Sequence, residues 1–218
     1  MKPIIASIIL MSAFTFKANA QNNKNQPDKQ SAPVSATGWY MSIYSGYNLF
    51  IAEYNDPLDK PCVLSFKNNG SPLATMYVGY DISPVIGFRM EFGYAGYKWT
   101  TLQNKTYKAT GTNLALDGTV NLSNWWNGYK PRFITMSIFG GIGIGYRSKG
   151  DYSADLTTYI VRFGMQSNLH ISHRLDMNIE LANNITSELM NEIVHGTPFT
   201  SIASLQLGLT YHFRAKRP

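Results

Sequence analysis

Apolar and polar side chains alternate along most of the chain from residue 38 onward. In the longest segment, Ile134, Met136 and Ile138 face one way, whereas Thr135 and Ser137 face the other. Alternation of this kind places successive side chains on opposite faces of a β-strand. Eight such segments occur, at residues 39–52, 73–82, 86–95, 114–122, 133–147, 158–171, 175–182 and 202–213. The pattern therefore predicts eight strands, each with one apolar and one polar face.

The connections between these segments also alternate in length. Those after the second and sixth segments are only a few residues long, and Ser83-Pro84 and Ser172-His173-Arg174 favour tight turns there. Those after the first, third, fifth and seventh segments are longer, roughly ten to twenty residues. An even number of strands with alternating short turns and long loops is typical of bacterial outer-membrane barrels whose N-terminus is periplasmic. The connection at 123–130 is somewhat longer than this rule predicts.

A soluble up-and-down barrel of the lipocalin type has the same period, with its apolar face turned inward. The polar face distinguishes the two folds. A face in contact with water is normally rich in Lys and Glu, whereas this one holds many glycines and a few charges in mid-strand. We therefore predict an all-β fold, an eight-stranded antiparallel up-and-down transmembrane β-barrel.

The composition supports a membrane location. Aromatic residues make up 13% of the chain and charged residues only 15%, which indicates much surface facing something other than water. No run of about 18 apolar residues follows the first twenty, so a bundle of membrane-spanning helices is excluded. A closed barrel is the remaining architecture that satisfies backbone hydrogen bonds in lipid.

The N-terminal residues predict export. Lys2 precedes a short apolar stretch, and Ala18-Asn19-Ala20 provides small residues before a cleavage site at Gln21. We divide the chain into a signal peptide (1–20), a disordered periplasmic leader (21–37), the outer-membrane barrel (38–213) and a short basic tail (214–218). The expected location is the outer membrane of a Gram-negative cell.

Six charged residues fall on the polar face of the strands, which would line the lumen. They are Arg89, Glu91, Asp117, Arg162, Asp176 and Glu180. The interior of an eight-stranded barrel is just wide enough to be filled by side chains, and buried charges must be paired or hydrated. We expect a network of ion pairs that closes the lumen, and the alternative is a narrow pore lined by the same charges.

Aromatic residues gather at one predicted end of the barrel. They are Trp39, Tyr40, Trp125, Trp126, Tyr129, Tyr211 and Phe213. Because Trp and Tyr favour the membrane–water boundary, these residues predict an aromatic girdle on the periplasmic side.

Motifs for chemistry are weak. The glycines at 140–145 continue a strand and precede no helix, so they do not indicate a phosphate-binding loop. The candidate catalytic residues His170, Ser172, His173, His195 and His212 form no defensible triad in the sequence. Neither His nor the single Cys62 has metal-ligand spacing. No basic stripe interleaves with aromatics, so nucleic acid is not an expected partner. We expect no enzyme activity, no cofactor and no metal.

Several short segments together resemble a known family. They are Gly38-Trp39-Tyr40, Gly87-Phe88-Arg89, Asn121-Leu122-Ser123-Asn124, Ser172-His173-Arg174-Leu175-Asp176-Met177-Asn178 and Leu207-Gly208-Leu209-Thr210-Tyr211-His212-Phe213. In order and spacing they are similar to the OmpA/OmpX-like outer-membrane barrels of Bacteroidetes. The resemblance implies insertion by the outer-membrane assembly machinery, which reads an aromatic-ended last strand. No peptidoglycan-binding domain follows the barrel here, so a role in cell-wall anchoring is not implied.

These observations favour a structural, accessory or surface-interaction role in the envelope. The expected contacts are outer-membrane lipid, the assembly machinery during insertion, and an envelope or surface partner reached through the outer stretches 50–72 and 184–201. Two other functions stay open, a narrow porin-like channel and, less favoured, a lipid-modifying enzyme.

Overall fold

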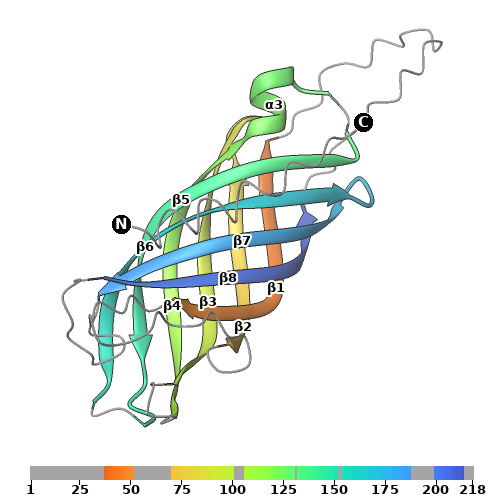
Figure 1. Cartoon of the computed structure of the whole chain (residues 1–218). Helices are drawn as coiled ribbons and strands as arrows, with labels where there is room; N and C mark the ends of the chain where they lie inside the picture. The colour runs from red at the N-terminus through yellow and green to blue at the C-terminus, as the bar shows by residue number, and fades with distance from the viewer. Residues whose placement is uncertain are drawn as a thin grey trace, which may run out of the picture. The chain divides into compact units, whose positions relative to one another are not determined.

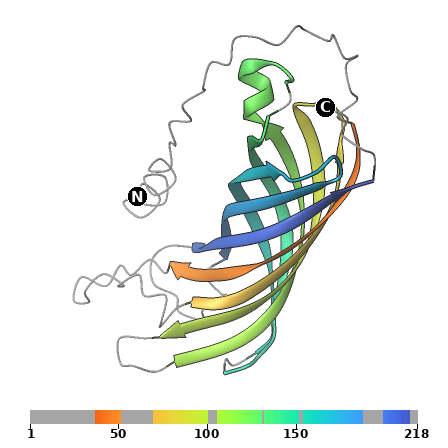
Figure 2. The same cartoon turned by 90° about the vertical axis from the view of Figure 1, so that its right-hand side faces the viewer.

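A computed structural model describes residues 37–51, 70–100, 106–130, 132–151, 154–187 and 199–213. It contains eight strands: β1 (Gly38–Ile51), β2 (Gly70–Asp81), β3 (Ile86–Thr100), β4 (Thr106–Asn121), β5 (Ile134–Arg147), β6 (Leu156–His170), β7 (Leu175–Ser187) and β8 (Phe199–His212). Each strand pairs antiparallel with the next, and β1 pairs with β8, so the sheet closes into a barrel. The predicted up-and-down barrel is confirmed. Figures 1 and 2 show its tilted strands from two sides.

The two ends of the barrel differ in their connections. At one end, called here the turn end, residues 82–85 and 171–174 join neighbouring strands, and β1 begins and β8 ends there. In both turns a serine hydroxyl accepts main-chain N–H bonds: Ser83 from Val85 and Ile86, and Ser172 from Arg174 and Leu175. The opposite end is called the loop end.

The connection between β4 and β5 contains a short helix that the sequence analysis did not predict, α3 (Leu122–Asn127). The Asn121 side chain caps its start by accepting the Asn124 N–H, and Gly128 with φ of 68° ends it. The Arg132 guanidinium then donates to the carbonyls of Ser123, Asn127 and Gly128. The bonds to Asn127 and Gly128 satisfy carbonyls that the end of a helix leaves without partners.

Several strands extend farther toward the loop end than predicted, most clearly β4, β7 and β8. β4 begins at Thr106 rather than near 114, so the connection after β3 is only 101–105. β7 and β8 together include residues 184–187 and 199–201, which were predicted to be outer loop. Beyond the apolar band, outward-facing positions such as Lys108 and Thr110 are polar, so apolar and polar residues no longer alternate in the sequence. The hydrogen bonds between the strands nevertheless continue. The predicted segments 1–36, 52–69, 188–198 and 214–218 lie outside the described residues.

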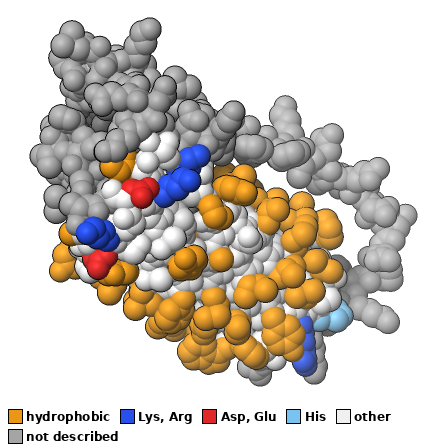
Figure 3. Space-filling view, turned by 90° about the horizontal axis from the view of Figure 1, so that it is seen from below, with side chains coloured by type: hydrophobic (Ala, Val, Ile, Leu, Met, Phe, Trp, Pro, Cys, Tyr) orange, Lys and Arg blue, Asp and Glu red, His pale blue; other side chains and the backbone are white. Residues whose placement is uncertain are grey.

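The apolar face of the strands points outward. Ile142, at the middle of β5, is 69% exposed, and large hydrophobic side chains are exposed on every strand. Figure 3 shows hydrophobic side chains spread over the barrel wall, with charged side chains gathered toward its ends. A continuous apolar belt of this kind is stable only in lipid, so the belt places this barrel in a membrane. Among the helices that the structure describes, none has the length and hydropathy needed to cross a bilayer.

Candidate functional site: the charged lumen

Arg89 of β3 lies at the centre of the lumen and is 2% exposed. Its Nε lies 3.0 Å from Asp117 Oδ2, and its Nη1 lies 2.7 Å from Glu180 Oε2. The same Nη1 donates to Gln166 Oε1 at 2.8 Å. Because β7 is not a neighbour of β3 in the sheet, the contact with Glu180 crosses the barrel interior.

Arg162 of β6 is the second buried guanidinium. It pairs with Glu91, and its Nε lies 3.3 Å from Asp117 Oδ1. Its Nη2 donates to the Tyr77 hydroxyl at 3.2 Å and lies 3.4 Å from Glu180 Oε1. Asp117 and Glu180 therefore each contact both arginines. Arg89, Glu91, Asp117, Arg162 and Glu180 form one connected group, called here the central network.

Aromatic rings pack against this network. The Arg89 guanidinium carbon lies 4.1 Å from the Tyr77 ring centroid and 4.2 Å from that of Phe139. The Tyr77 hydroxyl donates to Glu180 Oε1 at 2.8 Å, and Tyr44 meets Tyr77 edge-on with centroids 5.1 Å apart. A cation held between ring faces gains about 2 kcal/mol or more where water is excluded.

Glycines on the facing strands make room for these side chains. A Cβ at Gly141 would lie 2.3 Å from Asp117 Oδ1 and closer still to the Leu116 carbonyl. A Cβ at Gly164 would lie 2.5 Å from the Phe139 ring. The inward glycines that the sequence places in β5 and β6 are therefore packing positions, which agrees with the rejection of a phosphate loop at 140–145.

Asp176 was predicted with the central network, but the structure places it nearer the turn end. Asp176 Oδ1 lies 2.8 Å from His170 Nδ1, and Oδ2 lies 2.8 Å from His212 Nε2. The other ring nitrogen of His170 lies 3.3 Å from the Thr135 hydroxyl. These four residues, called here the turn-end cluster, join β5, β6, β7 and β8. Alternation gives the face of a residue but not its height along the barrel axis, and this height separates Asp176 from the arginines.

In the turn-end cluster a hydroxyl contacts an imidazole, which in turn contacts a carboxylate, as the side chains of a catalytic triad do. The sequence analysis did not find this arrangement. Thr135 is only 5% exposed, so its hydroxyl faces packed side chains rather than an open substrate site. The carboxylate also contacts a second histidine, His212. The geometry is that of a buried hydrogen-bond chain between strands.

The lumen changes character toward the loop end. Leu73, Ala95, Tyr97 and Ile202 form a buried apolar cluster. Between this cluster and the central network lies a cavity of about 20 Å³, lined by both apolar and polar groups, including Glu91, Arg162 and Gln206. A cavity of that volume holds about one water molecule. Across the described residues, no group of three or more His, Cys, Asp and Glu side chains could hold a metal ion.

The predicted girdle residues all lie at the turn end, and all but one of them are exposed. The exposed members are Trp39, Trp125, Trp126, Tyr129, Tyr211 and Phe213. The Trp125 and Trp126 rings stack on α3 with centroids 6.2 Å apart. Partial burial raises the pKa of the Tyr129 hydroxyl. Tyr40 was wrongly included. It follows Trp39 in the strand and therefore points to the opposite face, and its ring packs inward with its centroid 5.7 Å from that of the His212 ring.

Sequence reasoning missed several inward residues that complete the site. Tyr77, Phe139 and Gln166 contact the arginines directly. The same alternation that located Arg89 and Arg162 also assigns these residues to the lumen, so the signal was present. The search for charges alone passed over the aromatic and amide partners that buried guanidiniums require.

No family model matches the chain, and no curated protein matches it in sequence. Among solved structures, it is similar to Neisserial surface protein A, at 11% identity and a TM-score of 0.55, over 81% of this chain and 97% of that one. A second similar structure is the outer membrane protein OprG of Pseudomonas aeruginosa, at 9% identity and a TM-score of 0.49, over 82% and 98%. The first likeness shows the fold, that of an eight-stranded outer-membrane barrel.

Proposed function

We propose that the chain is an integral outer-membrane barrel with a structural or surface-interaction role, and that its own side chains close the lumen. The observation that carries this proposal is the central network, in which the contact between Arg89 and Glu180 spans the interior. The resemblance to OmpA/OmpX-like barrels of Bacteroidetes supports the same assignment and stays a prediction, as does insertion by the assembly machinery.

Closure follows from packing and charge together. Arg89, Arg162 and all three carboxylates of the central network are no more than 2% exposed. The interior of an eight-stranded barrel is just wide enough to be filled by side chains of this size. A passing hydrated ion would have to displace paired charges and leave them unpaired, at a cost of several kcal/mol. Solute passage through the lumen is therefore strongly disfavoured.

Conductance tests closure directly. The full chain, refolded into planar bilayers, should show no steady single-channel current in 1 M KCl. Transient spikes from insertion are not evidence of a pore, so the measurement is current sustained at constant voltage. Steady, reproducible unitary currents would contradict closure and favour the narrow channel, whose selectivity would depend on the lumen charges.

Location has an independent test. We expect the chain to fractionate with outer membranes and to migrate faster on a gel before heating than after it, because a closed barrel resists unfolding by detergent. Recovery in the soluble periplasmic fraction would contradict the proposal. A non-enzymatic role agrees with the burial of the Thr135 hydroxyl, which contacts His170.

A further inference from the structure

The buried apolar cluster on the loop-end side of the lumen is called here the apolar seal. It consists of Leu73 of β2, Ala95 and Tyr97 of β3, and Ile202 of β8. Leu156 of β6 packs against it. Because β6 lies opposite β2 in the closed barrel, Leu156 belongs to the wall that faces Leu73, and the packed side chains together cross the lumen.

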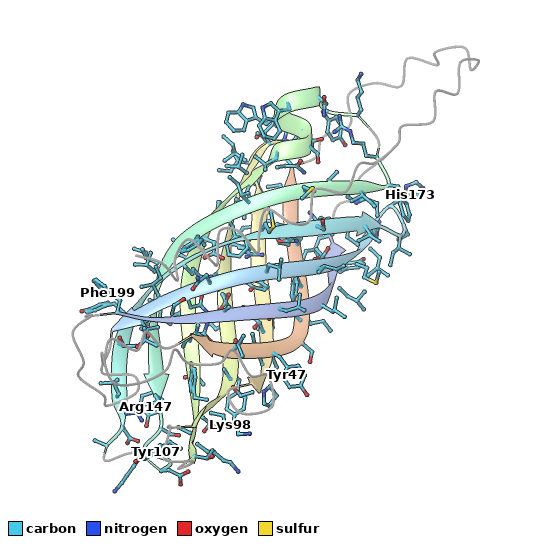
Figure 4. All side chains as sticks on the ribbon, viewed as in Figure 1. Tyr47, Lys98, Tyr107, Arg147, His173 and Phe199 are labelled. Atoms are coloured by element: carbon cyan, nitrogen blue, oxygen red, sulfur yellow. The ribbon has the colours of Figure 1, made fainter. Side chains whose placement is uncertain are left out.

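The apolar seal lies between the central network and the loop end. On β3, Ala95 and Tyr97 follow Arg89 along the same inward face, on its loop-end side. Tyr107, which Figure 4 labels at the loop end, also packs against the seal. Ala95 and Ile202 are each 2% exposed, the same value as Arg89, so this layer is as fully buried as the central network. A solute that enters from the loop end therefore meets apolar side chains before it meets the charges.

Glycines make room for this apolar layer, as they do for the arginines. A Cβ at Gly111 would lie 2.7 Å from Cε2 of the Tyr97 ring. A Cβ at Gly145 would lie 2.8 Å from Cδ1 of Ile160, a buried residue that lines the cavity between the seal and the central network. The absence of a side chain at these two positions therefore allows large apolar groups to fill the lumen.

The two layers oppose the passage of an ion by different means. In the central network, an ion must separate charges that are already paired. In the apolar seal, an ion must shed its water where no polar group replaces it, and a constriction of this kind blocks conduction by excluding water. Removal of charges weakens the first barrier and leaves the second unchanged.

We propose that the apolar seal is a second barrier in the lumen, in series with the central network, and that it blocks hydrated ions and small polar solutes on its own. This inference rests on the proposed closure of the lumen and assigns a role in it to residues outside the central network. It follows that loss of the buried charges destabilises the barrel without opening it.

Planar-bilayer recordings of variants of the full chain provide the test. R89A/E180A removes one charge of each sign together with the contact across the lumen, and it should show no steady current. Y97S/I202S opens the apolar seal, leaves the central network in place and should also be silent. The variant that carries all four changes should show steady unitary currents. Y97F/I202V, introduced into R89A/E180A, keeps the layer apolar and should restore no current.

Steady current through R89A/E180A, with a silent wild type, would overturn this inference and leave the proposed closure standing. Current through Y97S/I202S alone would instead support the seal and contradict closure by the central network. A silent fourfold variant that folds would overturn the inference, because other residues would then close the lumen. Heat-modifiable mobility shows whether each variant has folded, and R89A/E180A/I202S takes the place of the fourfold variant if that variant does not fold.

Discussion

The central network and the turn-end cluster are two buried polar layers of one lumen, yet they are built differently. The first holds two guanidiniums against three carboxylates, all buried, and aromatic rings cover the arginines. The second holds one carboxylate between two histidines, and the His170 side chain is 26% exposed. The comparison shows that burial alone does not set the energetic weight of a charge. The free-energy cost of removing a charged side chain depends on how many buried partners then lack an opposite charge.

The largest expected effect is that of Arg162→Ala. It leaves Glu91 buried without its guanidinium partner, and it removes contacts to Asp117 and Glu180. Breaking a buried ion pair costs about 3–5 kcal/mol. Urea unfolding in lipid vesicles measures this change in the free energy of unfolding. Arg162→Met separates loss of charge from loss of volume, and Lys149→Ala, at an exposed site, serves as a control with an effect near zero. A loss below about 1 kcal/mol for Arg162→Ala would indicate a hydrated lumen.

Asp176→Asn should have an intermediate effect. The amide keeps the shape and one acceptor oxygen, but it places an N–H₂ group against a histidine nitrogen that the carboxylate accepted from. A buried polar group left without its partner costs about 1–3 kcal/mol, and partial exposure of His170 lowers this value. The same unfolding measurement provides the test. If Asp176→Asn lowered the free energy of unfolding as much as Arg162→Ala, the turn-end cluster would stabilise the barrel as strongly as the central network, which would contradict the difference proposed between them.

The smallest effect is expected for Asp117→Asn. The central network has one carboxylate more than it has guanidiniums. Asp117 accepts a hydrogen bond from Arg89 Nε, and its other oxygen lies 3.3 Å from Arg162 Nε without a hydrogen bond. The amide oxygen can still accept that bond, and the surplus negative charge is removed. We expect a change within about 1 kcal/mol in either direction. Glu180→Gln is the matched comparison and should cost more, because Tyr77, Arg89, Arg162 and Gln206 all donate to Glu180. The reverse order of the two variants would contradict this count of donors.

The fold and the inward charges could be predicted because both depend on alternation. A side-chain period of two assigns Arg89, Arg162 and Glu180 to one face without knowledge of any contact. The contacts depend on the stagger between strands, which alternation does not contain. For this reason Asp176 was grouped with the arginines, whereas its contacts in the turn-end cluster are with His170 and His212. The six residues of α3 are too few for a helical period, although Asn121 and Gly128 are its capping signals.

The measurement that tests the central claim most directly is a double-mutant cycle between Arg89 and Glu180. It compares unfolding free energies of the wild type, Arg89→Met, Glu180→Gln and the variant that carries both changes. If the contact across the lumen is a desolvated ion pair, each single change leaves its partner unpaired, and the double change costs less than the sum. We expect a coupling energy of about 1–3 kcal/mol. Additive costs, with coupling near zero, would mean that water screens the two groups, and they would contradict a lumen closed by the central network.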